Sequence, residues 1–408
     1  MPTSTDELLR LLVEGIEREL ERAVALRHRL HSRPELAHAE EQTAATIAAE
    51  LPVAREAAAG TGLIARVEPG GANAEPTGRG PARRAAVAVR AELDGLPIEE
   101  RTGAPFASSG GVMHACGHDV HMAALVALTR AAHELRDLLP APLLAIFQPS
   151  EEAYPSGAGQ LAGAELAALA PAAVVAAHVH PQLPWGAVAL DAGAVNASCD
   201  AVEITVQGEP SHGAYPHLGR DPILALAHVV VALHAQVGRR IDPLSPASLT
   251  VGVLEGGSAE NVIPAWARAR GALRAHDPED RQTLREMVEQ VVAGVASAHG
   301  CRGSVELVPG EPPLVNDASI VAGARELLPG AGLQAAREWR SCGSDDFAFF
   351  GALAPVAMAF VGLDGAEGFH SRPLHHPELL PPDDAVRAVA RTQAVLYLAA
   401  ADSTQGRD

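Results

Sequence analysis

The stretch HMAALVALTRAAHELRDLLPAPLLAIF (residues 121–147) decides the fold class. It predicts a helix over 121–139, followed after a proline-containing turn by a short apolar strand, Leu143–Phe147. A second apolar run, Val174–Ala177, comes next along the chain. Strands without polar alternation are typically buried on both faces, and strands that alternate with helices build parallel sheets. The sequence therefore predicts an α/β fold with a mostly parallel central sheet flanked by helices.

The same pattern continues toward the N-terminus. A capping box at Ser4–Glu7 opens a helix that extends to about residue 30. Apolar runs at 63–67 and 85–89 predict two more strands, and the Gly-, Pro- and Ala-rich residues 70–84 between them predict a surface loop.

The pattern changes near Asn196. From residue 201 to residue 307 the order is strand, helix, strand, strand, helix, strand, which is the ferredoxin-like β-α-β-β-α-β arrangement. A buried strand and a closing helix follow. We expect an α+β domain at 197–308, inserted into a domain formed by 1–196 and 309–408.

Composition excludes several classes of function. The 408 residues carry a formal net charge of −19, and such an acidic surface repels nucleic acid and anionic membranes. All 31 basic residues are arginine, which excludes a Schiff-base lysine and a Walker-type phosphate loop. We find neither an uninterrupted membrane-length apolar run nor a signal peptide. Four cysteines favour reduced thiols and a cytoplasmic location.

The densest group of metal-binding side chains is MHACGHDVH (113–121), with five potential ligands within eight residues. Cys116 and His118 lie two apart around Gly117, so both can face one ion. Thiolate and imidazole ligands suit Zn²⁺ or a similar divalent metal. A buried cysteine with capping histidines is the alternative.

Three further motifs follow predicted strands or lie far downstream: FQPSEE (147–152), AHVHP (177–181) and LHHP (374–377). Ligands bind at the carboxyl ends of parallel strands. Adjacent Glu151 and Glu152 repel each other unless a cation or a proton intervenes, although a solvated helix start is an equal alternative. Each histidine alone has a structural explanation, but together the motifs predict a buried metal site.

Polar residues elsewhere have weaker signals. Asp94 follows the end of an apolar run. It can orient a ligating histidine, or it can form a turn with Gly95. In the inserted domain, His212, Asn261 and Arg274 can grip a carboxylate and a developing oxyanion. Each of these three also has an ordinary loop explanation.

These motifs resemble the metal-dependent aminoacylase and carboxypeptidase family of amidohydrolases, and within it the hippurate hydrolases and plant auxin–amino acid conjugate hydrolases. The matching segments, in chain order, are LRHRLHSRPEL (26–36), RAELDGLPIEE (90–100), MHACGHDVH (113–121), FQPSEE (147–152), AHVHP (177–181), SHGAYPH (211–217), GGSAENVIP (256–264), GSDDFAFF (343–350) and LHHP (374–377). They extend over nearly the whole chain.

The resemblance implies a catalytic domain that holds two divalent metal ions (zinc, manganese, cobalt or nickel) and an inserted lid domain that mediates a homodimer. The implied ligands are Cys116, His118, Glu152, His178 and His375. Glu151 matches the general base, and Asp94 matches an acid beside the metals. His212 matches a histidine that stabilises the oxyanion in the partner subunit's site, whereas Asn261 and Arg274 match substrate-binding positions.

The chain departs from the family pattern RADMDALP at Glu92 and Gly95, and Ser150 replaces the usual alanine of FQPSEE. Tyr154 and Pro155 alter the residues that follow the glutamate pair. The expected activity is hydrolysis of N-acyl amino acids to a carboxylic acid and an amino acid. A dipeptidase or N-carbamoyl amidohydrolase ranks lower, because such relatives carry His-x-Asp where Glu92 and Asp94 stand. A metal-binding homologue without catalysis is the other alternative.

Overall fold

The computed structural model describes residues 4–70 and 85–405, so the loop expected over 70–84 lies almost entirely outside the described residues. The chain forms two compact units. The larger comprises Met1–Gly193, Val315–Trp339 and Phe349–Asp408, and the smaller comprises Ala194–Leu314 and Arg340–Ala348. Each unit has its own apolar core.

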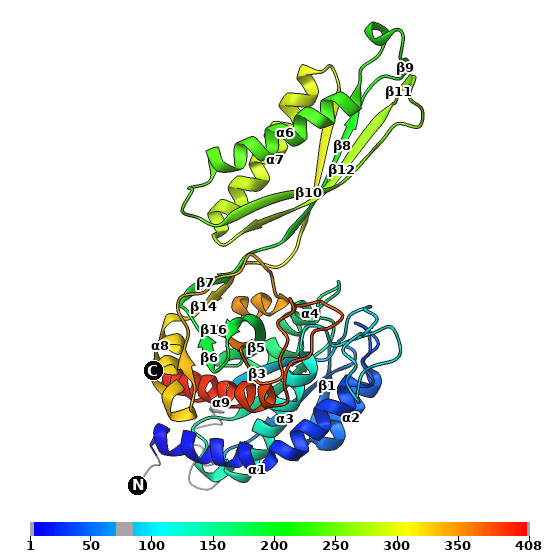
Figure 1. The fold of residues 1–408 in the computed structure, drawn as a ribbon. Coiled ribbons are helices and arrows are strands. Elements are labelled where there is room, and N and C mark those ends of the chain that lie inside the picture. The colour runs from blue at the N-terminus through cyan, green and yellow to red at the C-terminus, as the bar shows by residue number, and fades with distance from the viewer. Residues whose placement is uncertain (1–3, 71–84, 406–408) are drawn as a thin grey trace. The chain divides into compact units, whose positions relative to one another are not determined.

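An eight-stranded mixed sheet is the centre of the larger unit (Figure 1). Its strands, in order across the sheet, are β1 (Arg55–Ala58), β2 (Gly62–Val67), β4 (Leu143–Gln148), β3 (Val87–Glu92), β5 (Ala173–Pro184), β16 (Val356–Asp364), β6 (Ala187–Ala189) and β15 (Gln334–Ala335). The central strands β4, β3, β5 and β16 are parallel. Antiparallel pairs occur on both sides of them. The predicted α/β class is confirmed.

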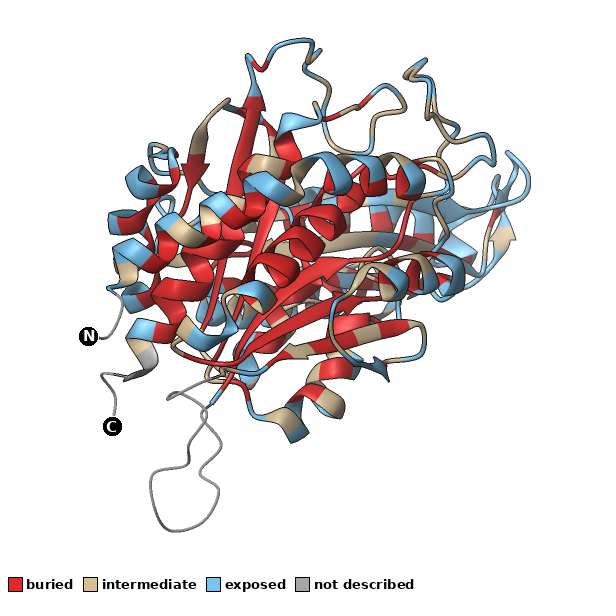
Figure 2. Cartoon of the chain, turned by 90° about the horizontal axis from the view of Figure 1, so that it is seen from below, coloured by how far each residue is buried: buried red, intermediate tan, exposed pale blue. Residues whose placement is uncertain are grey.

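Helix α3 (His118–Glu134) is buried along nearly its whole length, because β3 and β4 pack against one side and α1 against another. A helix that is apolar all round, as the run MAALVAL predicts, needs such a position. Helix α9 (Asp384–Gln405) packs on β5 and β16, and α1 (Thr5–His31) contacts both α3 and α9. Figure 2 shows the buried sheet with helices whose outer faces are exposed.

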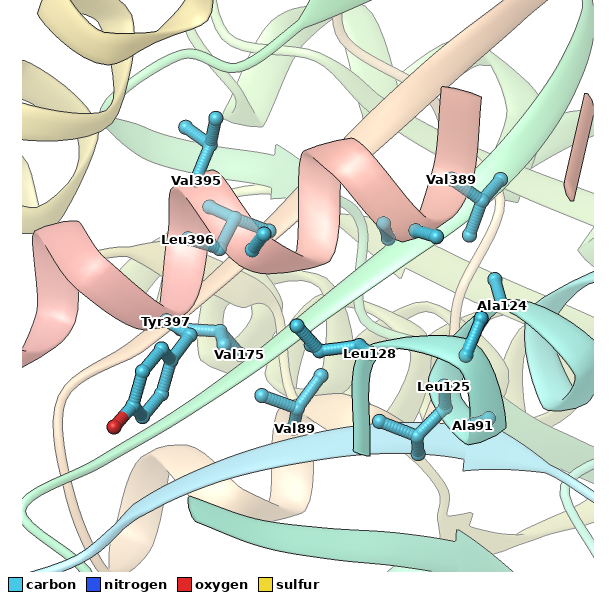
Figure 3. Close-up of a cluster of buried hydrophobic side chains, with 14 of the residues drawn as sticks. Val89, Ala91, Ala124, Leu125, Leu128, Val175, Val389, Val395, Leu396 and Tyr397 are labelled. Carbon is cyan, nitrogen blue, oxygen red and sulfur yellow. The ribbon is translucent and has the colours of Figure 1, made fainter. Parts of the chain in front are cut away.

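Figure 3 shows how this core is shared among four elements. The labelled side chains are Val89 and Ala91 from β3, Val175 from β5, Ala124, Leu125 and Leu128 from α3, and Val389, Val395, Leu396 and Tyr397 from α9. The remaining helices of this unit are α2 (Glu41–Glu50), α4 (Gly157–Gly163), α5 (Glu165–Leu169) and α8 (Ala318–Leu327).

Three of the boundaries that differ from the sequence-based expectation affect the site. Helix α3 begins at His118 rather than at 121, because Gly117 supplies its left-handed N-cap. Strand β3 continues to Glu92, and β5 continues to Pro184. Polar residues therefore lie within buried strands. Their side chains form hydrogen bonds with one another there, and the strand does not end at them.

The smaller unit contains the elements β8 (Asp200–Gln207), α6 (Pro222–Arg240), β10 (Ala247–Gly256), β12 (Trp266–Ala275), α7 (Pro278–Ala298) and β13 (Arg302–Pro309). Its sheet has the antiparallel order β10-β12-β8-β13. A short ladder pairs β9 (Ser211–His212) with β11 (Val262–Ile263). Residues 340–348, which the sequence places with the catalytic segments, join this unit, and the Ser341 N–H donates to Val195 O (2.9 Å).

Helix α6 has the length and the apolar composition of a membrane span. Its residues Ala225, Leu226, Val229 and Leu233 are buried in the core of the smaller unit. Packing in this core accounts for the apolar residues on one face of the helix. Other apolar residues of α6 lie on an exposed face.

Candidate metal centre

The turn before α3 places a thiol and an imidazole on either side of a glycine. Gly117 has φ +86°. A Cβ atom at this position would lie 2.4 Å from Val179 Cγ2, so the turn requires glycine both for its backbone conformation and for its close approach to β5. The flanking Cys116 and His118 are both buried.

Donor atoms from several segments of the larger unit meet beside this turn. The donors form three overlapping sets, and within each set the donor atoms lie within 4.8 Å of one another. The sets are Cys116, Glu152 and His375; His118, Glu151 and Glu152; and Glu92, His118, His121 and His178. Cys116 Sγ lies 3.5 Å from His178 Nε2, and His375 Nε2 lies 3.2 Å from Glu152 Oε1. The structure thus brings together all five side chains that the family resemblance implies as ligands.

Hydrogen bonds orient two of the histidines toward the cluster. His118 Nδ1 donates to Asp94 O (2.9 Å), and His178 Nδ1 donates to Val179 O (2.7 Å). Because each carbonyl holds the Nδ1 proton, Nε2 is in each ring the nitrogen that would bind a cation. His178 is buried, and burial holds its pKa well below the ordinary value, so the ring is neutral and able to bind a cation.

The C-terminal segment docks directly on the cysteine turn. His375 has a left-handed backbone (φ +64°), and its N–H donates to Ala115 O (2.8 Å). This backbone contact places a residue that is more than 250 positions downstream beside Cys116. Sequence spacing alone does not indicate such a contact.

Asp94 lies behind the glutamate pair. Its Oδ2 accepts the N–H of Glu152 (2.9 Å), and its Oδ1 lies 3.5 Å from His118 Nδ1. Burial alone would raise the pKa of Asp94, but His118 and the backbone N–H groups of Glu151 and Glu152 lower it, so the group is an anion. Asp94 therefore fixes both the ligand histidine and the backbone that carries the two glutamates.

The cluster fits divalent cations. His118 Nε2 and Asp94 Oδ1 are buried polar atoms without a hydrogen-bond partner among the described residues. Burial lowers the pKa of His118, but the carboxylates of Glu92, Asp94 and Glu152 outweigh it and raise that pKa to about 10. Such a negative potential attracts a positive ion, and the sulfur, nitrogen and oxygen donors suit zinc or a similar metal.

The turn that presents the glutamates is held by residues that the sequence analysis missed. Ser150 is buried with φ +53°, and its N–H donates to Glu40 Oε1 (2.8 Å). The Ser150 hydroxyl accepts the His38 N–H (2.9 Å), and Thr61 Oγ1 donates to Glu40 Oε2 (2.6 Å). Glu40 lies 110 residues upstream of Ser150. The only sequence feature that indicated this contact was the serine at position 150, where the family usually has alanine.

The other predicted site residues belong to the smaller unit. His212 is exposed on β9 and pairs in register with Val262, and the Gly213 N–H donates to Asn261 O (2.7 Å), so His212 and Asn261 are neighbours. Arg274 is half-buried on β12, and its Nη1 donates to Cys342 O (2.9 Å).

Several known proteins are similar to this chain over most of its length. N-acetyl-L-cysteine deacetylase of Bacillus subtilis is 34% identical over 89% of this chain and 84% of its own length. N-acetyldiaminopimelate deacetylase of Bacillus licheniformis is 31% identical over 93% and 98%. The solved structure of the Bacillus subtilis YXEP protein, described as a dinuclear metal binding peptidase from the M20 family, covers 94% of this chain and 98% of its own, with 27% identity and a TM-score of 0.80.

A family model also matches residues 88–397, which include every side chain of the donor cluster described above. The resemblance noted from the motifs is thereby confirmed. The chain belongs to the peptidase family M20/M25/M40, a family of amide-bond hydrolases.

Proposed function

We propose that this chain hydrolyses the amide bond of N-acyl amino acids and releases a carboxylic acid and a free amino acid. Two relatives that are 34% and 31% identical are named as deacetylases of such compounds. The observation that carries the proposal is the pair of adjacent carboxylates. Glu152 belongs to two of the donor sets described above, one with Cys116 and His375 and one with His118 and Glu151, whereas Glu151 belongs to only one of the three, where its Oε2 lies 3.9 Å from His118 Nε2. One acid is thus suited to bind metal and the other to act as a base.

Five side chains would hold two divalent ions: Cys116, His118, Glu152, His178 and His375. Their donors suit Zn²⁺, and Mn²⁺, Co²⁺ and Ni²⁺ are the other candidates. When bound, such ions polarise an amide carbonyl and acidify water. Asp94 would keep His118 and the glutamate turn in position through the contacts described above.

Glu151 would move the proton. Its carboxylate would accept a proton from the attacking water and return it to the leaving amide nitrogen. Its side chain is 13% exposed, so it is reachable from solvent yet surrounded by protein. General-base catalysis of this kind contributes roughly 10²–10⁴-fold to the rate.

In the smaller unit, we assign His212 to the oxyanion and Asn261 and Arg274 to the substrate carboxylate. The Ala214 N–H donates to His212 Nδ1 (3.0 Å), which leaves the proton on the exposed Nε2. That N–H is a suitable donor to a developing oxyanion. Arg274 and Asn261 supply the planar guanidinium and the amide that carboxylates prefer.

We also propose a homodimer formed through the smaller unit. Helix α6 exposes Ile223, Leu224 and Val231, with Val231 69% exposed. Helix α6 packs on a four-stranded sheet, and β10 is an edge strand of that sheet. An exposed apolar face next to an open strand edge is suited to a second copy of the same chain.

For location, we propose the cytoplasm. All four cysteines are free thiols in the structure, which fits a reducing compartment.

The test is a substrate panel on the metal-loaded protein. N-Acetyl-L-cysteine, N-acetyldiaminopimelate and N-benzoyl amino acids are compared with a dipeptide and an N-carbamoyl amino acid, each with Zn²⁺, Mn²⁺, Co²⁺ and Ni²⁺. We expect hydrolysis of N-acyl compounds that stops when a chelator removes the metal. Faster turnover of the dipeptide or the carbamoyl compound would overturn the substrate class, and no turnover of any compound would support a binding protein.

Cysteine substitutions give a matched control. Cys116→Ala should lower the metal content measured by elemental analysis and abolish hydrolysis. Cys342→Ala removes an exposed thiol from the smaller unit and should leave both unchanged. Equal metal content in the two variants would contradict the assignment of Cys116 as a ligand.

A further inference from the structure

His121 is a buried histidine of the donor cluster, and both of its ring nitrogens have protein partners. Its Nδ1 donates to Glu92 Oε2 (2.9 Å), and its Nε2 accepts the Val179 N–H (3.0 Å). A metal ligand needs a free lone pair, and His121 has already used its own. His121 therefore differs from His118 and His178, although it lies in the same cluster.

The Val179 contact compensates for the end of a strand pairing. The register of β3 with β5 runs from Val87 opposite Ala173 to Arg90 opposite Ala176. Three residues farther along β5, the Val179 N–H donates to the His121 ring instead of to a strand. Buried backbone N–H groups need a partner, and this histidine supplies it.

Glu92 holds the other side of the ring. Arg90 Nη1 donates to Glu92 Oε1, and Arg90 Nε donates to Gln148 Oε1 (2.8 Å). The Arg90 guanidinium is a permanent cation in direct contact with Glu92, so it holds Glu92 as a carboxylate. An anion facing Nδ1 keeps the proton there and leaves Nε2 as an acceptor.

Val179 is in turn the residue that orients His178. Its carbonyl accepts from His178 Nδ1 (2.7 Å), while its N–H is held by His121. A chain of contacts thus runs from the ion pair on β3 to His121 on α3, and from there through Val179 to the proposed ligand His178 on β5.

We propose that Glu92 and His121 form a positioning pair that is not itself metal-bound: it fixes Val179 and thereby aims His178 Nε2 at the metal beside Cys116. The inference rests on the proposed metal centre but not on the substrate. It also assigns a role to Glu92, the acid by which this chain departs from the family pattern.

The experiment is a Co²⁺ titration of the metal-free protein, followed by binding isotherm and by the visible absorption spectrum. His121→Leu fills similar space but removes both hydrogen bonds. We expect it to bind one of two Co²⁺ equivalents about 10–100-fold more weakly and to show an altered spectrum, as loss of a partner that orients a ligand typically does. His121→Gln, whose amide oxygen can replace Nε2 as an acceptor, should recover most of that affinity.

Thr129→Val is the matched control, because Thr129 is buried on the same helix and its hydroxyl donates to Leu125 O (2.7 Å) within that helix. It should bind both equivalents normally. Wild-type affinity and spectrum in His121→Leu would overturn the proposal, as would equal losses in His121→Leu, His121→Gln and Thr129→Val, because these would indicate general loosening. If the wild-type protein binds fewer than two equivalents, the metal centre fails and this inference fails with it. A failed substrate panel with normal Co²⁺ binding would overturn only the proposed activity.

Discussion

Glu92, a member of the donor cluster, forms a buried ion pair with Arg90, and each partner has further contacts. The Arg90 side chain is fully buried and also bonds to Gln148, while Glu92 also accepts from His121. Removing one member of such a pair takes away much of the compensation of the other charge in a medium of low polarity.

Glu92→Gln should reduce the free energy of unfolding of the metal-free protein by about 3–5 kcal/mol, measured by urea denaturation. Glu17→Gln is the control, since Glu17 pairs with Arg387 and Arg391 at the surface and should cost under about 1 kcal/mol. Equal effects of the two substitutions would show that Arg90 tolerates the loss of its partner.

Some site residues could be predicted from the sequence, and the roles of others could not. Cys116, His118 and the two glutamates are recognisable because their motifs are short and lie next to apolar runs. The roles of His121 and Ser150 depend on Val179 and Glu40, which are distant in sequence. A pattern that names possible ligands cannot reveal which nitrogen already has a partner.

At the scale of elements, the entry into α3 controls the site. Gly117 must adopt a left-handed conformation, and β5 passes within van der Waals contact of it. Any side chain there would strain the backbone and push Val179 away. The turn, the helix start and the strand are therefore one structural unit.

Gly117→Ala should destabilise the protein by more than the roughly 1–2 kcal/mol of a left-handed alanine, because the Cβ contact adds overpacking. It should also lower the content of bound metal. Gly103→Ala separates the two causes, since Gly103 has φ +71° but no atom within 4 Å of the added Cβ. A Gly117→Ala variant no less stable than Gly103→Ala would argue against close packing at this turn.

Helices α1 and α3 are joined by a buried charge network. Asp119 accepts from Arg27 Nε and from His31 Nδ1, both at 3.0 Å, and His31 Nε2 lies 3.1 Å from Glu100 Oε1. Burial lowers the pKa of His31, but Asp119 and Glu100 outweigh it and raise the pKa to about 9. The histidine is therefore protonated at neutral pH in the folded chain.

A pKa that folding raises favours the folded state at low pH. The contribution of His31 should be complete below the unfolded value of about 6.5 and should disappear as pH rises through about 9. The stability difference between the wild type and His31→Gln, measured by urea unfolding, should shrink by up to about 3 kcal/mol between those limits. A difference that does not change with pH would show that His31 is neutral in the folded protein.

At the scale of the whole molecule, the alternation of helices and strands was sufficient to predict an α/β unit and a β-α-β-β-α-β unit. The position of residues 340–348 was not predictable, because a backbone bond to Val195, rather than a periodic pattern, ties them to the smaller unit. The antiparallel edges of the large sheet were missed for a similar reason. Short strands such as β6 and β15 carry too few residues to show a pattern.

The proposed dimer has its own test. Val231→Glu places a charge in the exposed apolar face of α6 and should shift the protein from dimer to monomer in analytical ultracentrifugation. Val308→Glu alters β13, at the opposite edge of the same sheet, where the valine is 53% exposed, and should leave the mass unchanged. A wild-type monomer, or a dimer that survives Val231→Glu, would contradict this interface.

The most direct test of the central claim is to measure metal content and turnover together in Glu151→Gln. The proposed role of Glu151 is proton transfer and not metal binding. This variant should therefore hold both metal ions and bind substrate, while kcat falls by about 10²–10⁴-fold. Turnover at the wild-type rate, or loss of the metal along with activity, would contradict it.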